Sequence, residues 1–235
     1  IQVYTKGEAV MTVGIVVAMD KEVAPFLKGK NATEIRYGKY SVFNFKLAGK
    51  DIYLIRQYSV GEICAAGATQ ILITKFGADV ILNFGVVGAL TSEISLLSTM
   101  AVGSVVHYAM DTTSFNGYEL GKYSCFDDVA IACDKKLLDI VSGIVPDLPV
   151  VRCASADKFV DSAQEKRFLN EQFKADICDM ESAGIVITCA FNEIPCLLIK
   201  TVSDSLTGGG KQYSETVLQA VTQYVSVVEK VLERL

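Results

Sequence analysis

The chain has 235 residues, of which 51% are hydrophobic and 21% charged, so it is long and apolar enough to bury one sizeable core. Its net charge of -5 favours neither a nucleic acid nor an anionic membrane as a partner. The high apolar content, with only four prolines, argues against disorder. No apolar run in the sequence reaches the roughly 18 residues that a membrane-spanning helix needs.

The first half of the chain alternates between apolar strands and a helix. The predicted elements, in chain order, are strands at 12–19, 40–49 and 51–58, a helix at 62–77, and strands at 79–90 and 102–110. The run at 12–19 is continuously apolar, which is typical of a strand buried on both faces, and 79–90 is predicted to be a second fully buried strand. The helix carries small and apolar residues at helical spacing and ends at Gly77, a residue type that favours helix C-termini.

The second half begins with a polar, irregular stretch at 111–128, which predicts a loop or flap. The elements after it are a helix at 134–144, a strand at 149–156, helices at 162–173 and 179–193, a strand at 195–204 and a closing helix at 213–235. Ser162, with Glu165 three residues later, forms the pattern of a capped helix start. Because buried strands alternate with helices, we expect an α/β domain with a largely parallel central sheet.

The cysteines and the N-terminus bear on location and boundaries. The seven cysteines are odd in number, and no two have CxxC spacing. Most lie in apolar runs, where a free thiol behaves as a small hydrophobe, so we expect a reducing, cytoplasmic compartment. Residues 1–10 lack the apolar core of a signal peptide. We expect residues 1–11 to be an upstream extension or a cloning remnant, and residues 12–235 to form a single domain.

Three carboxylates fall near the ends of predicted strands. Glu22 follows the first strand, Asp204 ends the last one, and Glu181 lies at the start of the helix between 179 and 193. Each alone is commonly only a helix-dipole partner or a turn former. Ligands in such sheets, however, bind beyond the carboxyl ends of the strands, where these three acids are expected to meet.

Three acids at one rim suit cleavage of a glycosidic bond, which passes through an oxocarbenium-like state. One carboxylate activates water, a second acid protonates the leaving group, and a third accepts hydrogen bonds from sugar hydroxyls.

Other kinds of site find little support. There is no GxGxxG fingerprint of a dinucleotide site. The segment GGGKQ looks like a phosphate loop, but Ser205 stands where that loop needs Gly, and Gln212 where it needs Ser or Thr. The only histidine, His107, lies in a predicted buried strand, where a hydrogen-bonded core role is the simpler interpretation. A His-rich metal site is therefore not expected.

Six segments occur in the order and spacing of a known family, namely VGIVVAMDKEVAPF, YSVGEICAAGATQ, ADVILNFGVVGAL, SADKFV, DMESAGI and TVSDS. From about Val13 to the C-terminus, the chain resembles the 5′-methylthioadenosine/S-adenosylhomocysteine nucleosidases of the purine nucleoside phosphorylase superfamily. The resemblance implies a three-layer sandwich like that of the nucleoside phosphorylases, in which helices flank a mixed, mostly parallel central sheet. It implies no metal and no organic cofactor.

The resemblance also assigns roles to residues. Glu22 matches the base that activates the attacking water, Asp204 the acid that protonates the purine at N7, and Glu181 the carboxylate that holds the ribose hydroxyls. The other positions it matches to the substrate pocket are Met19 and Val60 around the sugar and its 5′ group, Val86 in the glycine turn, Phe159 stacked on the base, Val160 at the purine edge, Met180 under the sugar, Ser203 beside the acid, and Tyr213 as an aromatic at the 5′ group.

The family's 5′ pocket is completed by a partner subunit. By resemblance we therefore expect a homodimer in which Phe115 or Tyr118 reaches across to the neighbouring site. An apolar flap of this kind suits a thioether substituent and excludes water.

Several positions depart from the family pattern. Val86 stands where the family has a serine that helps to orient the catalytic acid, and Lys200 stands in place of an arginine. In the loop SVGE, Ser59 and Glu62 replace a glycine and a lysine. These differences predict either an altered substrate or a lower rate.

The choice between hydrolysis and phosphorolysis depends on a phosphate site. Phosphorolysis needs cations around a dianion, but the chain has Asn83 and Val86 where the phosphorylase branch has arginine and serine. We expect Glu62 to repel phosphate, and Arg56 is the one candidate cation nearby. The favoured interpretation is an N-ribohydrolase acting on 5′-methylthioadenosine or S-adenosylhomocysteine. A phosphorylase of purine nucleosides or uridine, and a nucleoside-binding protein with weak catalysis, are the alternatives.

Overall fold

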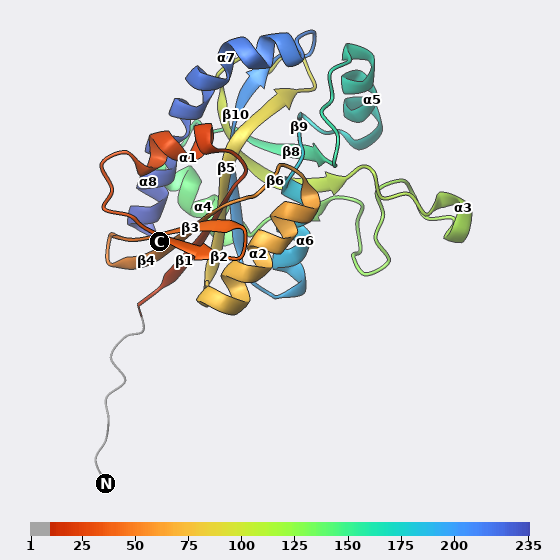
Figure 1. The fold of residues 1–235 in the computed structure, drawn as a ribbon. Coiled ribbons are helices and arrows are strands. Elements are labelled where there is room, and N and C mark those ends of the chain that lie inside the picture. The colour runs from red at the N-terminus through yellow and green to blue at the C-terminus, as the bar shows by residue number, and fades with distance from the viewer. Residues whose placement is uncertain (1–9) are drawn as a thin grey trace.

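The computed structural model describes residues 10–235, which form one α/β domain built on a mixed sheet (Figure 1). Its strands are β1 (Thr12–Val17), β2 (Thr33–Tyr37), β3 (Tyr40–Leu47), β4 (Lys50–Arg56), β5 (Val80–Ala89), β6 (Thr99–His107), β7 (Ile131–Ala132), β8 (Val150–Ser155), β9 (Ile177–Asp179) and β10 (Cys196–Asp204). Its helices are α1 (Asp20–Leu27), α2 (Glu62–Phe76), α3 (Thr113–Asn116), α4 (Lys135–Ile144), α5 (Ala163–Phe173), α6 (Ser182–Phe191), α7 (Gly210–Gln223) and α8 (Val225–Arg234).

The strand order is β10-β6-β8-β9-β5-β1-β4-β3-β2, and an additional pairing joins β10 to β5. That pairing closes the strands β5, β9, β8, β6 and β10 into a ring. The long, buried strand β5 has three strand partners. It pairs in parallel with both β1 and β10, and antiparallel with β9 at its end. The mixed central sheet of the sequence interpretation is confirmed, with β1, β4, β5 and β10 as its parallel core.

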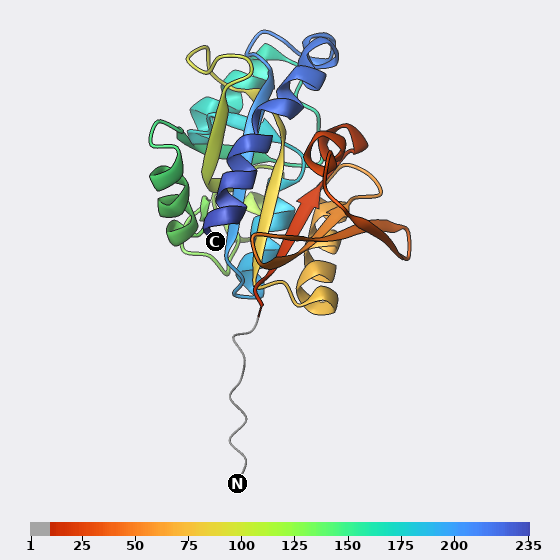
Figure 2. The same cartoon turned by 90° about the vertical axis from the view of Figure 1, so that its left-hand side faces the viewer.

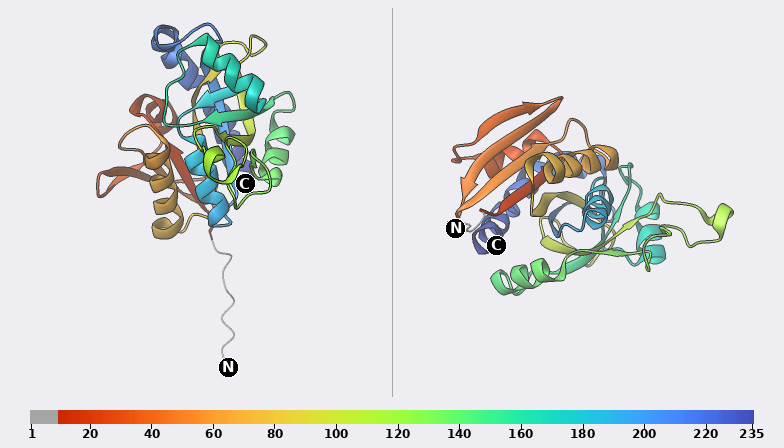
Figure 3. Two further views of the ribbon diagram at one scale, coloured as in Figure 1. Left: turned by 90° about the vertical axis from the view of Figure 1, so that its right-hand side faces the viewer. Right: turned by 90° about the horizontal axis from the view of Figure 1, so that it is seen from below.

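Helices cover both sides of this sheet, as predicted. On one side α2 and α6 lie side by side, where Ala65, Ala68 and Leu72 pack into the same apolar cluster as Ile185 and Val186 (Figure 3, left). On the other side α1, α4, α7 and α8 share a second cluster, and α7 and α8 cross β5 and β10 (Figure 2). The short helix α3 stands away from the body of the domain (Figure 3, right).

The long elements confirm the sequence interpretation, and five short ones do not appear in it, namely α1, β2, α3, β7 and β9. Helix α1 follows β1 directly, although Pro25 lies inside it. Strand β2 pairs with β3 at the edge of the sheet and is exposed at every residue. Strand β9 occupies the residues just before α6, so the predicted helix at 179–193 begins later than expected.

The predicted closing helix at 213–235 was wrong as a single element. The chain forms α7 and α8, separated at Tyr224. The Tyr224 side chain is fully buried, and its hydroxyl donates a hydrogen bond to the backbone carbonyl of Glu22 at 3.3 Å. The break therefore lets an aromatic from this segment pack under α1.

Two predictions concern the ends of the domain and its relation to membranes. The expected extension at 1–11 falls mainly on residues 1–9, which lie outside the described residues, so it stays a prediction. Between residues 10 and 235, none of the helices combines the length and the apolar composition needed to cross a bilayer.

Candidate active site

A cavity of about 350 Å³ opens at the rim where the carboxyl ends of the parallel strands meet. Its lining includes all eleven of the site residues predicted from the sequence: Met19, Glu22, Val60, Val86, Phe159, Val160, Met180, Glu181, Ser203, Asp204 and Tyr213. Segments far apart in the chain therefore come together at one place. The lining is mostly apolar, with carboxylates at separate points of its wall.

Glu22 sits in the first turn of α1, and its side chain is only 2% exposed. Its Oε2 accepts a hydrogen bond from the backbone N–H of Met19 at 3.0 Å, and its Oε1 accepts one from that of Val86 at 3.1 Å. Burial raises the pKa of Glu22 to about 7, although the Val86 hydrogen bond and the nearby Lys200 ammonium oppose the shift. A carboxylate with such a pKa suits a general base near neutral pH.

Glu181 is the residue at the N-terminal cap of α6 and is half-buried. Its Oε1 accepts a hydrogen bond from the backbone N–H of Gly61 at 2.9 Å. Gly61 has a φ of 114°, and a Cβ there would lie 2.5 Å from a carboxylate oxygen of Asp157, so this position requires glycine. Burial, followed by the charge of Asp179, raises the pKa of Glu181 to about 8.

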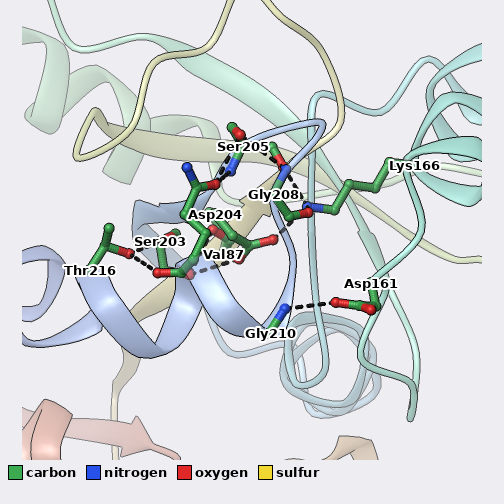
Figure 4. Close-up of polar contacts among 10 residues, drawn as sticks. Val87, Asp161, Lys166, Ser203, Asp204, Ser205, Gly208, Gly210 and Thr216 are labelled. Atoms are coloured by element: carbon green, nitrogen blue, oxygen red, sulfur yellow. Dashed lines mark hydrogen bonds and ion pairs between the residues drawn. The ribbon is translucent and has the colours of Figure 1, made fainter.

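Asp204 ends β10 and is 2% exposed (Figure 4). Its Oδ1 lies 3.0 Å from the hydroxyl of Ser203, and its Oδ2 forms an ion pair with Lys166 Nζ at 2.5 Å. The sequence interpretation did not single out Lys166, which lies on α5. The signal was available, because Lys166 shares the apolar face of α5 with Leu169 and Phe173.

A buried ion pair lies behind Glu181. Lys200 Nζ contacts Asp179 Oδ2 at 2.7 Å, and both side chains are almost wholly inaccessible. Burial opposes ionisation of Asp179, but Lys200 and the hydroxyls of Ser155 and Ser182 outweigh it and lower the pKa of Asp179. The lysine that replaces the family's arginine therefore retains a carboxylate partner.

Glu62, which was expected to repel phosphate, does not reach the cavity. Glu62 is buried, does not line the cavity, and accepts hydrogen bonds from the Ser155 hydroxyl and the backbone N–H of Gly184. The Ser155 hydroxyl also contacts Asp179 Oδ1 at 2.6 Å. The Ser155 hydroxyl has one proton and can donate it to only one of the two carboxyl groups. Both contacts are hydrogen bonds when Glu62 is protonated and donates to the Ser155 oxygen, while Ser155 donates to Asp179. Burial, then the charge of Asp179, raises the pKa of Glu62 to about 7. This raised pKa favours the protonated form of Glu62.

Two aromatic rings stand at the mouth of the cavity. Phe159 is 43% exposed, and its ring meets that of Tyr213 edge to face at a centroid distance of 5.7 Å. The Tyr213 hydroxyl lies 3.4 Å from Met19 Sδ, and Val60 completes this apolar edge. The arrangement leaves one ring face available for a planar base and an apolar wall for a thioether.

The cations near the cavity are already engaged. Arg56 forms an ion pair with Asp20 at 3.0 Å and does not line the cavity. Lys158 does line it, but its ammonium pairs with Glu165 at 2.5 Å. The Asn83 amide donates to the backbone carbonyl of Val16 at 2.8 Å. Among the described residues, the cavity lining contains no arginine.

The remaining candidate residues lie outside the cavity. His107 ends β6 and its Nδ1 contacts the Tyr123 hydroxyl at 2.7 Å, while burial lowers its pKa. Its place as a satisfied, partly buried histidine agrees with the sequence interpretation. Phe115 and Tyr118, in and after α3, are 89% and 40% exposed.

Known proteins share the sequence pattern and the fold of this chain. The sequence profile of the phosphorylase superfamily matches residues 12–235. This chain belongs to the phosphorylase superfamily. The superfamily predicted from the sequence is confirmed, and with it the nucleoside phosphorylase-like fold.

Relatives of this superfamily member carry nucleosidase names. The aminodeoxyfutalosine nucleosidase of Campylobacter jejuni is 27% identical over 232 residues, which cover 96% of this chain and all of that protein. The 5′-methylthioadenosine/S-adenosylhomocysteine nucleosidase of Staphylococcus haemolyticus is 29% identical over 229 residues, 94% of this chain and 99% of the relative. The crystal structure of the Helicobacter pylori 5′-methylthioadenosine/S-adenosylhomocysteine nucleosidase with butyl-thio-DADMe-Immucillin-A has a TM-score of 0.91 at 24% identity, with 97% and 100% coverage, and shows the shared fold.

Proposed function

We propose that this superfamily member is an N-ribohydrolase that cleaves the N-glycosidic bond of a purine nucleoside with water as the nucleophile. The observation that carries the proposal is the placement of Glu22, Glu181 and Asp204 around one cavity of about 350 Å³. Each carboxylate is held by a separate partner, a backbone N–H for the first two and a buried lysine for the third. The size of the cavity suits a nucleoside.

Glu22 is the proposed base. Both of its oxygens are held by backbone N–H groups, so its side chain is oriented before substrate arrives. As the C1′–N9 bond lengthens, a water attacks C1′ and passes its proton to Glu22. The pKa of about 7 lets the carboxylate take up this proton without being fully protonated beforehand.

Asp204 is the proposed acid. In this step its O–H bond breaks, an N7–H bond forms, and the electron pair of the C1′–N9 bond moves onto the purine. Glu181 is placed to accept hydrogen bonds from the ribose hydroxyls, and the exposed ring of Phe159 is placed to stack on the base.

Water is favoured over phosphate by the charges of the cavity. A phosphate dianion needs unpaired cations, and the cation that lines the cavity, Lys158, is paired with Glu165. Glu22, which must be ionised to act as the base, lies in the same wall and repels a dianion further. A phosphorylase is therefore the second candidate, and a nucleoside-binding protein with weak catalysis is the third.

The simplest substrates are 5′-methylthioadenosine and S-adenosylhomocysteine, because Met19, Val60 and Tyr213 give the cavity an apolar edge suited to a 5′ thioether. The relative named aminodeoxyfutalosine nucleosidase supports aminodeoxyfutalosine as an alternative substrate. With the first substrates, the enzyme would take part in methionine salvage.

A homodimer and a cytoplasmic location are part of the proposal. The 89% exposure of Phe115 and the projection of α3 from the domain support a flap that covers a neighbour's cavity (Figure 3). The seven cysteines are free thiols, which supports a reducing compartment.

The test is release of free base from 5′-methylthioadenosine, S-adenosylhomocysteine, aminodeoxyfutalosine, adenosine and inosine, by the wild type and by Asp204→Asn. We expect release by the wild type and a loss of about 10²- to 10⁴-fold in kcat for the variant. Near-normal turnover by Asp204→Asn would contradict the role of the acid. Tight binding with no release from any of these nucleosides would favour the binding protein.

A further inference from the structure

Lys166 is a charged residue at a buried helix position that an apolar side chain usually occupies. It lies on α5, on the face that it shares with Leu169 and Phe173, and its exposure is 0%. Withdrawing an ammonium group from water is costly unless a charged partner and further acceptors receive it. The packing of α5 alone does not account for a lysine here.

The Lys166 ammonium has three acceptors, and all lie at the end of β10 (Figure 4). It contacts Asp204 Oδ2 at 2.5 Å, the backbone carbonyl of Ser205 at 2.7 Å and that of Gly208 at 3.2 Å. Its three N–H donors are thus matched by one carboxylate and two carbonyls. The lysine therefore connects α5 to the acid and to the turn that follows it.

The Asp204 carboxyl is fixed from several sides. Lys166 occupies Oδ2, and the Ser203 hydroxyl lies 3.0 Å from Oδ1. Gly88 of β5 packs against the same group, because a Cβ there would lie 3.0 Å from Oδ2 and 3.4 Å from the Lys166 ammonium. Oδ1 is consequently the oxygen that the cation leaves unengaged.

We propose that Lys166 is the positioning residue for the catalytic acid, an inference that rests on the proposed function. It donates a hydrogen bond to Oδ2, so that Oδ1 carries the proton before the step and delivers it to N7. Once the Asp204 O–H bond has broken and the N7–H bond has formed, the aspartate carries a negative charge in a buried site. The fixed ammonium at 2.5 Å stabilises this charge more in the transition state than in the ground state.

This role also accounts for Val86. A valine side chain has no hydroxyl with which to orient the acid. In this chain the cation from α5 and the hydroxyl of Ser203 hold Asp204 instead.

A double-mutant cycle tests the proposal with Asp204→Asn, Lys166→Met and the double variant, assayed on the nucleoside that the wild type cleaves fastest. Lys166→Met should lower kcat about 10²-fold with KM changed by less than about threefold, since the lysine does not line the cavity. In the Asp204→Asn background, Lys166→Met should change kcat by less than about threefold, because the lysine acts through the acid. A further loss of about 10²-fold in that background would overturn the proposal.

Controls separate positioning from folding. Arg167→Met removes an exposed cation from the next position of α5 and should leave kcat unchanged. Lys166→Arg keeps the charge and should recover most of the kcat lost in Lys166→Met; a folded arginine variant as slow as the methionine variant would contradict the role. If Lys166→Met alone does not fold, Lys166→Gln, which keeps hydrogen-bond donors but removes the charge, replaces it in the cycle with the same expected changes in kcat. Wild-type kcat in Asp204→Asn would instead overturn the proposed function itself.

Discussion

The Glu22 carboxylate accepts a hydrogen bond from the backbone N–H of Val86 at 3.1 Å, which joins the first turn of α1 to the middle of β5. The contact uses the backbone of residue 86, so it does not depend on the side chain at that position. It orients a buried carboxylate whose pKa is raised to about 7. Several measurable properties of the protein depend on this one group.

The pH dependence of kcat/KM should show the titration of Glu22. A general base must be ionised, so activity should rise as pH increases through the pKa of Glu22, about 7. The measurement is kcat/KM between about pH 5 and pH 9 on the best nucleoside. An acidic limb near the ordinary glutamate pKa of 4.5 would contradict the assignment of Glu22 as base.

Stability should also depend on Glu22. Because its pKa in the folded chain lies above 4.5, folding favours the protonated form, so its stabilising effect is complete below about pH 4.5 and is lost as pH rises through about 7. Relative to Glu22→Gln, the wild type should lose about 3 kcal/mol of unfolding free energy between about pH 5 and pH 9. Urea unfolding at the two pH values measures it, and a constant difference between the proteins would count against the raised pKa.

The Lys200–Asp179 pair should be essential to stability. Lys200→Met leaves the Asp179 carboxylate buried without its cation, which should lower the melting temperature by about 10 °C. The matched control is Lys200→Met with Asp179→Asn, in which no unpaired charge remains, and much of the loss should be recovered. Equal melting temperatures for the single and double variants would show that the ion pair contributes little.

Phe159 should contribute to recognition of the base. Phe159→Ala removes the exposed ring at the cavity mouth and should raise KM about tenfold, with a smaller change in kcat. Phe168→Ala is the control, because that ring is similarly exposed, at 49%, but lies on α5 away from the lining. If both variants behave alike, Phe159 does not stack on the base.

Glu181 should distinguish ribonucleosides from 2′-deoxynucleosides. If its carboxylate accepts hydrogen bonds from the ribose hydroxyls, the wild type should prefer the ribonucleoside by about tenfold or more in kcat/KM. Glu181→Gln should reduce this preference, mainly by slowing the ribonucleoside. A preference that survives unchanged in the variant would place ribose recognition elsewhere.

The layers of the fold follow closely from the sequence. The mainly apolar runs that became β1 and β5 are buried at every residue except the half-buried Thr12 and Val86. Ser162 caps α5 by accepting from the Glu165 N–H at 3.4 Å. Short or atypical elements were not predictable in this way. Helix α1 has only eight residues, with Pro25 inside it, and β2 has only five, all of them exposed, so neither gives a strong signal of its structure.

The site residues also divide into those that the sequence predicts and those that it does not. Residues at or just after strand ends, such as Asp204 at the end of β10 and Phe159 after β8, could be placed at one rim by the rule for parallel sheets. The helical period of α5 indicates that Lys166 is buried but not what it contacts, because its partner depends on which strand end α5 packs against. The direction of Glu62 was misjudged for a related reason, since the first turn of α2 faces inward, towards Ser155.

The identity of the nucleophile is the central claim, and one measurement tests it most directly. Turnover of the best nucleoside is followed with and without phosphate in isotopically labelled water, and the sugar product is analysed. The account predicts equal rates and a free sugar that carries the label at C1′. Strict dependence on phosphate, with a sugar 1-phosphate as the product, would contradict it.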